Sequence, residues 1–477
     1  MDNHLDLIWE DILSDTPINR VKIIDFIISL IETGKLSPGS KIPSLRQLAF
    51  ILSVSPTTIK KAYKQLENTK YLKVIPSNGT YVNDILPFEG KRYDPLWPPH
   101  APYSYRDQHT IYGGADTTGS IPYISAGSDV PDISILSIER FVNYYRGRKN
   151  QYKKELSVRA EYPEIISIEI NKILLKRDIH VSPGQSMSVP CGFALYLVAR
   201  TLIKNGESVV MASASDIQAQ GIFLTVGAQL AYTGIDDQGM MISELENLCA
   251  KRKVKAVFLR PAADFPFNVV LSEARRQALV KLSIKYHFVI IAFDDNREFW
   301  FQKELTPLIN RIHEGHVIYV SPVSKISEQF KSHELIVATP DFIEVLNKTM
   351  LAQRIILEPV YFLAMCLLIN SGELEVELKK VMRHYKKTRK SIHEYCTTYL
   401  SHSCEITFPI AGLGLWITFH NGLEAGKLKT LLEEHGLSNR MCTIENLQQP
   451  IYGLHLGFGS QPSSSWEHFF VGMSAIL

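Results

Sequence analysis

The stretch "PSLRQLAFILSVSPTTIKKAYKQLE", residues 43–67, contains the signals for two short helices in close succession. Ser44 and Gln47 have the spacing of a capping box, which predicts a helix that begins just after Ser44. Ser55 followed by Pro56 predicts a second helix start, because serine caps a helix and proline fits its first turn. Two such helices joined by the tripeptide "SVS" predict a helix-turn-helix, whose second helix would read the major groove of DNA.

The segments on either side complete a small domain. Before it, "INRVKIIDFIISLIETG" (18–34) places apolar residues at spacings of three and four, as expected for one face of an amphipathic helix. After it, "YLKVIPSNGTYV" (71–82) indicates two short strands around an Asn78-Gly79 turn, a hairpin of the kind called a wing. The sequence therefore predicts a mainly helical, winged helix-turn-helix domain over residues 1–83.

The charge of the second helix favours contact with nucleic acid. The chain of 477 residues has a net charge of only +2, so any surface that attracts phosphates must be local. Residues 57–73 carry five lysines against the single acidic Glu67, and two threonines stand at the start of the helix. A lysine taken singly is typical of a solvated helix face. The order of helix, turn, polar helix start and wing is what indicates DNA binding.

The same residues carry a resemblance to a known family. The stretch 43–67 and the wing "SNGTYV" resemble the winged helix of the GntR family of bacterial regulators, and the resemblance extends over residues 18–83. Many members have a DNA-contacting arginine where this chain has Pro56, so we expect one contact to be missing. The resemblance implies a double-stranded DNA operator as partner, and a DNA-binding set of Ser44, Arg46, Thr57, Thr58, Lys60, Lys61, Asn78 and Gly79.

Beyond residue 83 the composition changes twice. Residues 84–118 are rich in proline, glycine and aromatic residues without periodicity, which predicts a linker with a semi-rigid "WPPHAP" core. Later, apolar runs such as "VKAVFLRP", "HFVIIAF" and "HVIYVSP" alternate with helical patterns, which predicts a mainly parallel sheet with flanking helices. We expect this large domain over 119–345, then a long basic helix and a small α+β domain over 346–477.

The second part of the chain resembles the fold-type I aminotransferases. The resemblance is carried by "SPGQSMSVPCGFALYLVARTLI" (182–203), "FDDNREFWF" (293–301) and "VIYVSPVSKISEQF" (317–330). With the winged helix in front, the whole chain resembles the MocR subgroup of the GntR regulators. That subgroup implies a head-to-tail homodimer, a small-molecule effector, and pyridoxal phosphate held as a Schiff base by Lys325.

Lys325 matches the family, but the groups that would hold the pyridine ring do not. The cofactor needs an acid at its ring nitrogen and a donor at its ring oxygen. When the chain is aligned on the shared Glu-Phe pair at 298–299, the acid falls on Phe293 and the ring-oxygen tyrosine on Asp295. A shift of one residue would supply Asp294 as the acid, but it would not restore the tyrosine.

The groups that would hold the phosphate and the substrate are also replaced. The phosphate arginine becomes Ser332, with Lys331 beside it as a substitute, and Pro190 in the phosphate turn has no N–H. Aspartates close to a phosphate dianion would oppose its binding by Coulomb repulsion. We therefore expect an abandoned or repurposed pocket, in which only Lys325, Asp294 and Lys331 are left to hold the cofactor. The other replaced positions are Asp216, Ala263, Asp264 and His455.

Four functions follow from this pattern. The leading hypothesis is a transcriptional regulator whose aminotransferase-like domain serves dimerisation and ligand sensing without catalysis. The first alternative is a regulator that senses its effector through a pyridoxal phosphate aldimine at Lys325. The second is an aminotransferase, for which His455 is a poor substitute for a carboxylate-binding arginine. The third is a scaffold that binds a partner protein, which the sequence neither supports nor excludes.

Composition also indicates in which cellular compartment we expect the protein. No apolar run approaches the ~20 residues needed to cross a bilayer, and the acidic start lacks the basic flank of a signal peptide. Six scattered cysteines without a C-x2-C pair indicate reduced thiols, so we expect a cytoplasmic protein. His393, Cys396, His402 and Cys404 lack the repeated spacings of zinc ligands, so we expect no metal there.

Overall fold

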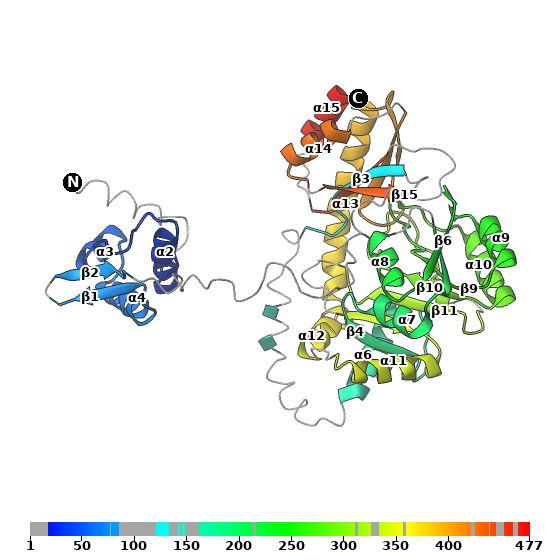
Figure 1. Ribbon diagram of the computed structural model, residues 1–477, viewed down its shortest axis with the longest axis horizontal. Coiled ribbons are helices and arrows are strands. Elements are labelled where there is room, and N and C mark those ends of the chain that lie inside the picture. The colour runs from blue at the N-terminus through cyan, green and yellow to red at the C-terminus, as the bar shows by residue number, and fades with distance from the viewer. Residues whose placement is uncertain are drawn as a thin grey trace, which may run out of the picture. The chain divides into compact units, whose positions relative to one another are not determined.

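In a computed structural model the chain forms two compact units, Met1–Arg106 and Asp107–Leu477 (Figure 1). The domain boundaries expected at residues 83 and 118 remain predictions, because residues 85–120 lie outside the described part of the chain. The structure describes residues 18–76, 78–84, 121–132, 142–143, 146–147, 162–212, 216–310, 313–325, 333–355, 359–420, 425–437, 439–444, 453–460 and 466–477.

The first unit has the helix-turn-helix and wing that the sequence predicts. Ser44 forms both bonds of the capping box: its hydroxyl accepts from the Gln47 N–H at 3.3 Å, and its own N–H donates to the Gln47 side chain at 3.0 Å. Ser55 caps the next helix by accepting from the Thr58 N–H at 3.2 Å. The elements are α2 (Arg20–Glu32), α3 (Leu45–Ile51), α4 (Pro56–Asn68), β1 (Leu72–Ile75) and β2 (Gly79–Val82).

One apolar core holds these elements together. Ile27 from α2, Leu48 from α3 and Ile59 from α4 are fully buried, and Val82 brings the wing into the same core. Burial of each such side chain stabilises the unit by roughly 1.5–3 kcal/mol before the cost in conformational entropy. Because α4 turns its apolar residues inward, its polar residues face outward.

Seven strands form the large sheet of the second unit, in the order β4-β12-β11-β10-β9-β5-β6. The strands from β11 to β6 pair in parallel, whereas β12 is antiparallel to both β11 and β4. This confirms the predicted, mainly parallel sheet. The strands are β4 (Ser186–Pro190), β5 (Ser208–Ala212), β6 (Gln229–Thr233), β9 (Val254–Leu259), β10 (Val289–Phe293), β11 (Val317–Pro322) and β12 (His333–Val337), and a small ribbon is formed by β7 (Ile235–Asp236) and β8 (Gly239–Met240).

Helices cover both faces of this sheet, because alternate residues of each strand point to opposite sides. Val209 and Met211 of β5 join the core under α7, α8 and α11, while Val210 and Ala212 join the core under α9 and α10. A third cluster packs α6 and α12 against β11 and β12. The helices are α6 (Tyr162–Lys176), α7 (Ala194–Leu202), α8 (Ile217–Thr225), α9 (Ile242–Lys251), α10 (Glu273–Tyr286), α11 (Pro340–Ala352) and α12 (Pro359–Asn370), with a 3₁₀ turn at Leu308–Asn310.

The small domain contains a five-stranded sheet in the order β13-β14-β16-β3-β15. Its strand β3 (Ile121–Ser128) falls in the range predicted for the large domain, but it pairs with β15 and β16 of this sheet. Gly127 lets β3 and β16 approach closely, since a Cβ there would lie 2.2 Å from the Gly457 carbonyl oxygen. The remaining elements are the predicted long helix α13 (Glu373–Tyr399), β13 (Cys404–Thr407), β14 (Gly414–Phe419), α14 (Ala425–Glu434), β15 (Asn439–Ile444), β16 (Gly453–Phe458) and α15 (Trp466–Ile476).

Two features of the fold bear on function. None of the helices in the described ranges is both long and apolar enough to cross a membrane. The parallel strands β5, β9, β10 and β11 are neighbours, so their carboxyl ends meet at one edge of the sheet. Ligand sites of open α/β sheets form at this edge.

Candidate functional site

The start of α4 presents a polar, cationic surface. Pro56 occupies the first helical position, and Thr57, Lys60 and Lys61 are exposed on the helix. The N-terminus of a helix carries a partial positive charge that attracts phosphate oxygens, and Lys60 and Lys61 add full positive charges. No ion pair neutralises Lys60 or Lys61 within the described part of the chain. This surface can contact DNA phosphates and base edges.

Thr58 and Ser44 differ from the rest of the predicted DNA-binding set because their hydroxyl groups take part in helix caps. Thr58 is half-buried, and its hydroxyl lies 2.8 Å from the Ser55 hydroxyl, within the helix cap. The Ser44 hydroxyl is likewise engaged in the capping box of α3. Arg46, the second residue of α3, is exposed. The structure thus gives Thr58 and Ser44 a structural role and leaves Arg46 accessible.

The wing places Asn78 and Gly79 at the tip of the hairpin. Asn78 is exposed, and its side-chain oxygen accepts a hydrogen bond from the Tyr81 hydroxyl at 3.0 Å. Gly79 has a φ of +132°, and a Cβ there would lie 2.8 Å from Cε of Lys41. Lys41, whose Nζ lies 5.7 Å from the centre of the Tyr81 ring, is a cation beside the wing that sequence reasoning missed.

Lys325 follows β11, is buried, and has its amine engaged by the protein itself. Its Nζ lies 3.2 Å from a carboxylate oxygen of Asp295 and donates to the Asn296 side-chain oxygen at 2.9 Å. Its backbone N–H donates to the buried Glu298 at 2.7 Å. The side chain is 7% exposed. The amine is therefore held as one partner of an internal ion pair.

Arg260, which sequence reasoning missed, extends this ion pair along the sheet edge. Its guanidinium pairs with Asp216 on one side and, at 3.1 Å, with Asp295 on the other, and it lies 5.3 Å from the centre of the Phe293 ring. Burial lowers the pKa of Arg260, but the carboxylates of Asp295 and Asp216 outweigh burial and raise it. Asp216, Arg260, Asp295 and Lys325 follow β5, β9, β10 and β11. These strands are adjacent, so the four residues form a row of alternating charge.

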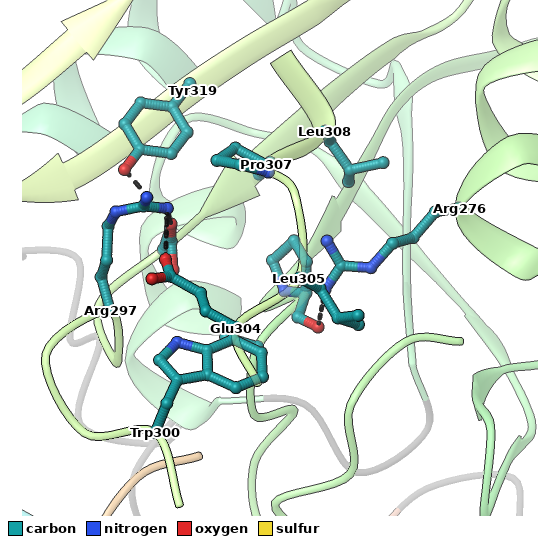
Figure 2. Close-up of a pocket in the computed structure, with 12 residues that line it drawn as sticks. Arg276, Arg297, Trp300, Glu304, Leu305, Pro307, Leu308 and Tyr319 are labelled. Atoms are coloured by element: carbon teal, nitrogen blue, oxygen red, sulfur yellow. Dashed lines mark hydrogen bonds and ion pairs between the residues drawn. The ribbon is translucent and has the colours of Figure 1, made fainter. Parts of the chain in front are cut away.

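Asp294, the sequence candidate for the ring-nitrogen acid, lies elsewhere. Adjacent residues leaving a strand point to opposite sides, so Asp294 lies on the other side of the sheet edge from Asp295. Its carboxylate accepts a hydrogen bond from the Tyr319 hydroxyl at 3.2 Å and lies 3.7 Å from the Arg297 guanidinium. These residues line a separate pocket of about 20 Å³, in which Arg297 also pairs with Glu304 at 2.7 Å (Figure 2). Burial raises the pKa of Asp294. No hydrogen bond or ion pair in the described residues joins Asp294 to Lys325.

The turn that the family resemblance assigns to phosphate is occupied by a carboxylate. The backbone N–H of Ala194, the first residue of α7, donates to the side chain of Glu334 at 2.9 Å. Glu334 lies on β12 and is buried. The start of α7 is a natural anion site, and here the anion comes from within the chain. Lys331 and Ser332, the other phosphate positions, lie outside the described residues.

A cavity of about 110 Å³ opens beside Arg260. It is lined by two acidic side chains, Asp216 and Glu334, by the aromatic rings of Phe258 and Phe293, and by apolar residues of α7 and α8. The ring centres of Phe258 and Phe293 are 6.4 Å apart. The Arg260 guanidinium and the Gln218 side chain also line the cavity, so its polar positions carry charges of both signs.

Asp264 and His455, two more positions at which this chain differs from the aminotransferase pattern, lie near this site. Burial raises the pKa of Asp264 to about 7, while Arg260 acts to lower it and Asp216 to raise it. His455 is buried on β16, with its ring nitrogens 3.3 Å from the Asn268 amide nitrogen and 3.3 Å from the Ser125 hydroxyl. The site thus contains a carboxyl group that titrates near neutral pH.

Of the four residues considered as metal ligands, Cys396 and Cys404 lie in the small-domain core, whereas His393 and His402 are exposed. Cys396 and Cys404 are buried free thiols, and burial raises the pKa of both. The His393 ring lies 5.0 Å from the Phe408 ring. Within the described residues, no group of three or more side chains is arranged to bind a metal ion.

Comparison with known proteins places these observations in context. Residues 19–82 match the family of bacterial regulatory proteins called gntR. The uncharacterized HTH-type transcriptional regulator YisV of Bacillus subtilis (strain 168) is 24% identical over 426 residues, which cover 87% of this chain and 86% of YisV. The probable rhizopine catabolism regulatory protein MocR of Rhizobium meliloti is 22% identical over 477 residues, which cover 97% of this chain and 94% of MocR.

Among solved structures, the kynurenine aminotransferase of Pyrococcus horikoshii is similar to the second unit. It matches with a TM-score of 0.64 at 19% sequence identity, over 74% of this chain and 90% of the enzyme. This likeness shows the fold, with its seven-stranded sheet and small domain. The chain therefore carries a GntR-type helix-turn-helix domain in front of a domain with the fold-type I aminotransferase fold.

Proposed function

We propose that this protein binds double-stranded DNA through its first unit and regulates transcription. The observation that carries the proposal is the exposed surface at the start of α4, where Thr57, Lys60 and Lys61 surround a helix N-terminus. Arg46 on α3 adds an exposed cation in the same unit. Relatives named as transcriptional regulators align along most of the chain, which supports the proposal.

The test begins with duplexes selected by the full-length protein from a randomised library. Fluorescence anisotropy on the enriched sequence should then show binding that Lys60→Ala weakens about equally for all sequences. That change should reduce the slope of log affinity against log salt by about one. Thr57→Ala should relax sequence preference, because in the proposed complex its exposed hydroxyl would contact base edges. Lys281→Ala, an exposed lysine on α10 of the other unit, is the control. A selection that enriches no sequence would refute the proposal.

We further propose that the second unit dimerises and senses a ligand without catalysis. A single winged helix reads one half-site, so a homodimer would pair two half-sites and gain specificity. The head-to-tail homodimer of the MocR subgroup would serve this purpose, and such a regulator would act in the cytoplasm. Light scattering should give twice the monomer mass, and a footprint should cover two half-sites.

The residues around Lys325 do not fit pyridoxal phosphate. The lysine amine is paired with Asp295. The alignment with the family puts the apolar Phe293 at the position of the ring-nitrogen acid, and Asp294, the alternative acid, lies in a separate pocket. The carboxylate of Glu334 takes the N–H at the start of α7. A phosphate dianion entering there would meet that charge and Asp216 at close range. We therefore propose that the pocket binds a ligand other than this cofactor.

Absorbance and peptide mapping test this second proposal. Protein incubated with excess pyridoxal phosphate should show no visible band, and borohydride reduction should label Lys325 no more than the exposed Lys281. A band that Lys325→Ala removes, while Lys281→Ala keeps it, would establish the alternative in which Lys325 forms an aldimine. Amino-group transfer from any amino acid would instead support an aminotransferase.

A further inference from the structure

The middle of α13 carries a dense run of positive charge. The helix packs against α12 at the large domain and against α15 of the small domain (Figure 1). Between Leu378 and His393 it has seven lysines and arginines and no acidic residue. The whole chain has 51 basic and 49 acidic residues, so this run is a strong local departure from a nearly neutral composition.

These cations lie on the face of α13 that is opposite to its buried face. Val381, Tyr385 and Ile392 are buried in the small-domain core. Because successive residues of a helix are 100° apart, Arg383 and Lys390 point almost directly away from that core. The exposed cations centred on this outer face are here called the basic stripe: Lys379, Arg383, Lys386, Lys387 and Lys390. The stripe is about 16 Å long at a rise of 1.5 Å per residue.

Only the ends of the basic stripe follow the charge pattern of the neighbouring helices. On α11 and α14 an exposed lysine lies close to a glutamate one turn away. In the same way Lys379 pairs with Glu375 at 2.7 Å, and Lys390 lies 3.7 Å from Glu394. The charge at these two ends is therefore partly compensated within the helix.

The middle of the stripe is not compensated in this way. Among the residues that the structure describes, none forms an ion pair with Arg383, Lys386 or Lys387. The Nε–H of Arg383 donates to the Lys379 carbonyl oxygen at 3.3 Å, which leaves its two terminal nitrogens for another acceptor. Like charges three and four positions apart repel and weaken a helix. An anionic partner would remove this repulsion.

The shape of the stripe indicates the class of anion. Neither of the two cavities described above is lined by a residue of α13, so the stripe is a convex surface without a pocket for a small anion. Extended lysine and arginine side chains in a row fit an extended polyanion. Double-stranded DNA carries one negative charge per about 1.7 Å of its axis, so 16 Å of duplex presents about nine charges.

We propose that the basic stripe of α13 is a second DNA-contacting surface, which binds phosphates of the duplex outside the base pairs that the first unit reads. The inference rests on the proposed function, in which the first unit binds a specific DNA sequence. Contacts to phosphates add affinity and carry no sequence information. The stripe would therefore strengthen binding to any operator and leave the choice of operator to α4 and the wing.

A triple variant of the full-length protein tests the stripe. The duplex is the sequence enriched from the randomised library, extended at both ends by unselected sequence. Combining Arg383→Ala, Lys386→Ala and Lys387→Ala should weaken binding at low salt by about tenfold or more, and should reduce the slope of log affinity against log salt by about two to three. The ratio of affinities for the selected and a scrambled duplex should stay the same. Urea unfolding should show no loss of stability, because alanine favours a helix.

The matched control removes the same charge from another surface of the second unit. Lys251, Arg252 and Lys253 are exposed at the end of α9, and their combined replacement by alanine also removes two lysines and one arginine. This control should keep the affinity and the salt slope of the wild type. An equal loss in both triple variants would show that net charge acts without a specific surface, and would overturn the inference.

Two further outcomes decide against the stripe. If light scattering shows that the α13 variant has lost its dimer along with its affinity, the stripe is a subunit contact and the inference is wrong. If the selection enriches a sequence and the α13 variant binds it like the wild type, this inference alone fails. A selection that enriches no sequence refutes the DNA-binding proposal itself, so the two failures are distinguishable.

Discussion

Replacement of Arg260 by methionine should destabilise the second unit strongly. Methionine keeps much of the side-chain volume but leaves Asp216, whose side chain is 11% exposed, without its cation. Loss of one partner of a fully buried pair costs about 3–5 kcal/mol, because the remaining charge is neither solvated nor paired. Asp295 keeps Lys325, and both carboxylates retain some contact with solvent. We therefore expect a loss of about 3 kcal/mol in the free energy of unfolding.

A second substitution makes this prediction specific. In Arg260→Met combined with Asp216→Asn, no unpaired charge remains at this position, so about half or more of the loss should be recovered. Urea unfolding followed by tryptophan fluorescence and circular dichroism would give the free energies for both variants. Arg275→Met is the control, since its partner Asp236 is 38% exposed and can return to water. A loss below about 1 kcal/mol for Arg260→Met, with no recovery in the double variant, would refute the reasoning.

The remaining predictions concern the helix cap, a titrating carboxyl group and a close approach of two strands. Ser44→Ala should destabilise the first unit by about 1 kcal/mol in a thermal melt, because it removes the capping box of α3. Burial raises the pKa of Asp264 from 3.8 to about 7, so between these values the folded protein holds a proton that the unfolded chain releases. The free energy of unfolding should therefore fall as the pH rises from about 4 to 7. Asp264→Asn should remove up to about 4 kcal/mol of that decline, measured by urea unfolding across this range. Gly127→Ala should lower the free energy of unfolding by about 3 kcal/mol or more, since φ is +72° and the new Cβ would meet Gly457. Gly426→Ala, with open space around its Cβ, is the control and should be neutral in the same urea unfolding.

The first unit could be predicted from its sequence almost completely, because its signals are local. The capping box at Ser44, the Ser55-Pro56 helix start and the wing turn each depend on residues within a few positions of one another. The apolar strands of the large sheet were equally accessible, since a strand buried on both faces is apolar along its length. The pairing partners of β3 could not be predicted, because they lie more than 300 residues away in sequence.

The candidate site could be predicted only in part. The alignment on the Glu-Phe pair drew attention to Phe293 and Asp295, and in the structure Phe293 lines the cavity and Asp295 pairs with Lys325. Their roles toward a cofactor stay predictions. Arg260 and Glu334 were missed, because each gains its role from a residue that is distant in sequence. One signal was available for Arg260: a charged residue directly after an apolar parallel strand lies at the edge where other strand ends converge. Its partners Asp216 and Asp295 follow neighbouring strands and occupy that same edge.

Under the proposal that the pocket does not hold pyridoxal phosphate, the row of alternating charge offers a physical reason why the fold would persist without that cofactor. A bound ligand stabilises the folded state, and its loss removes that contribution and leaves polar groups at the strand ends without partners. In this chain Arg260 and Lys325 satisfy Asp216 and Asp295, and Glu334 satisfies the start of α7. The apolar alternation that builds the sheet is untouched by these exchanges, because it lies along the strands and not beyond their ends. The edge could therefore change its ligand chemistry while the sheet kept its shape, which is the condition for reusing this scaffold as a sensor.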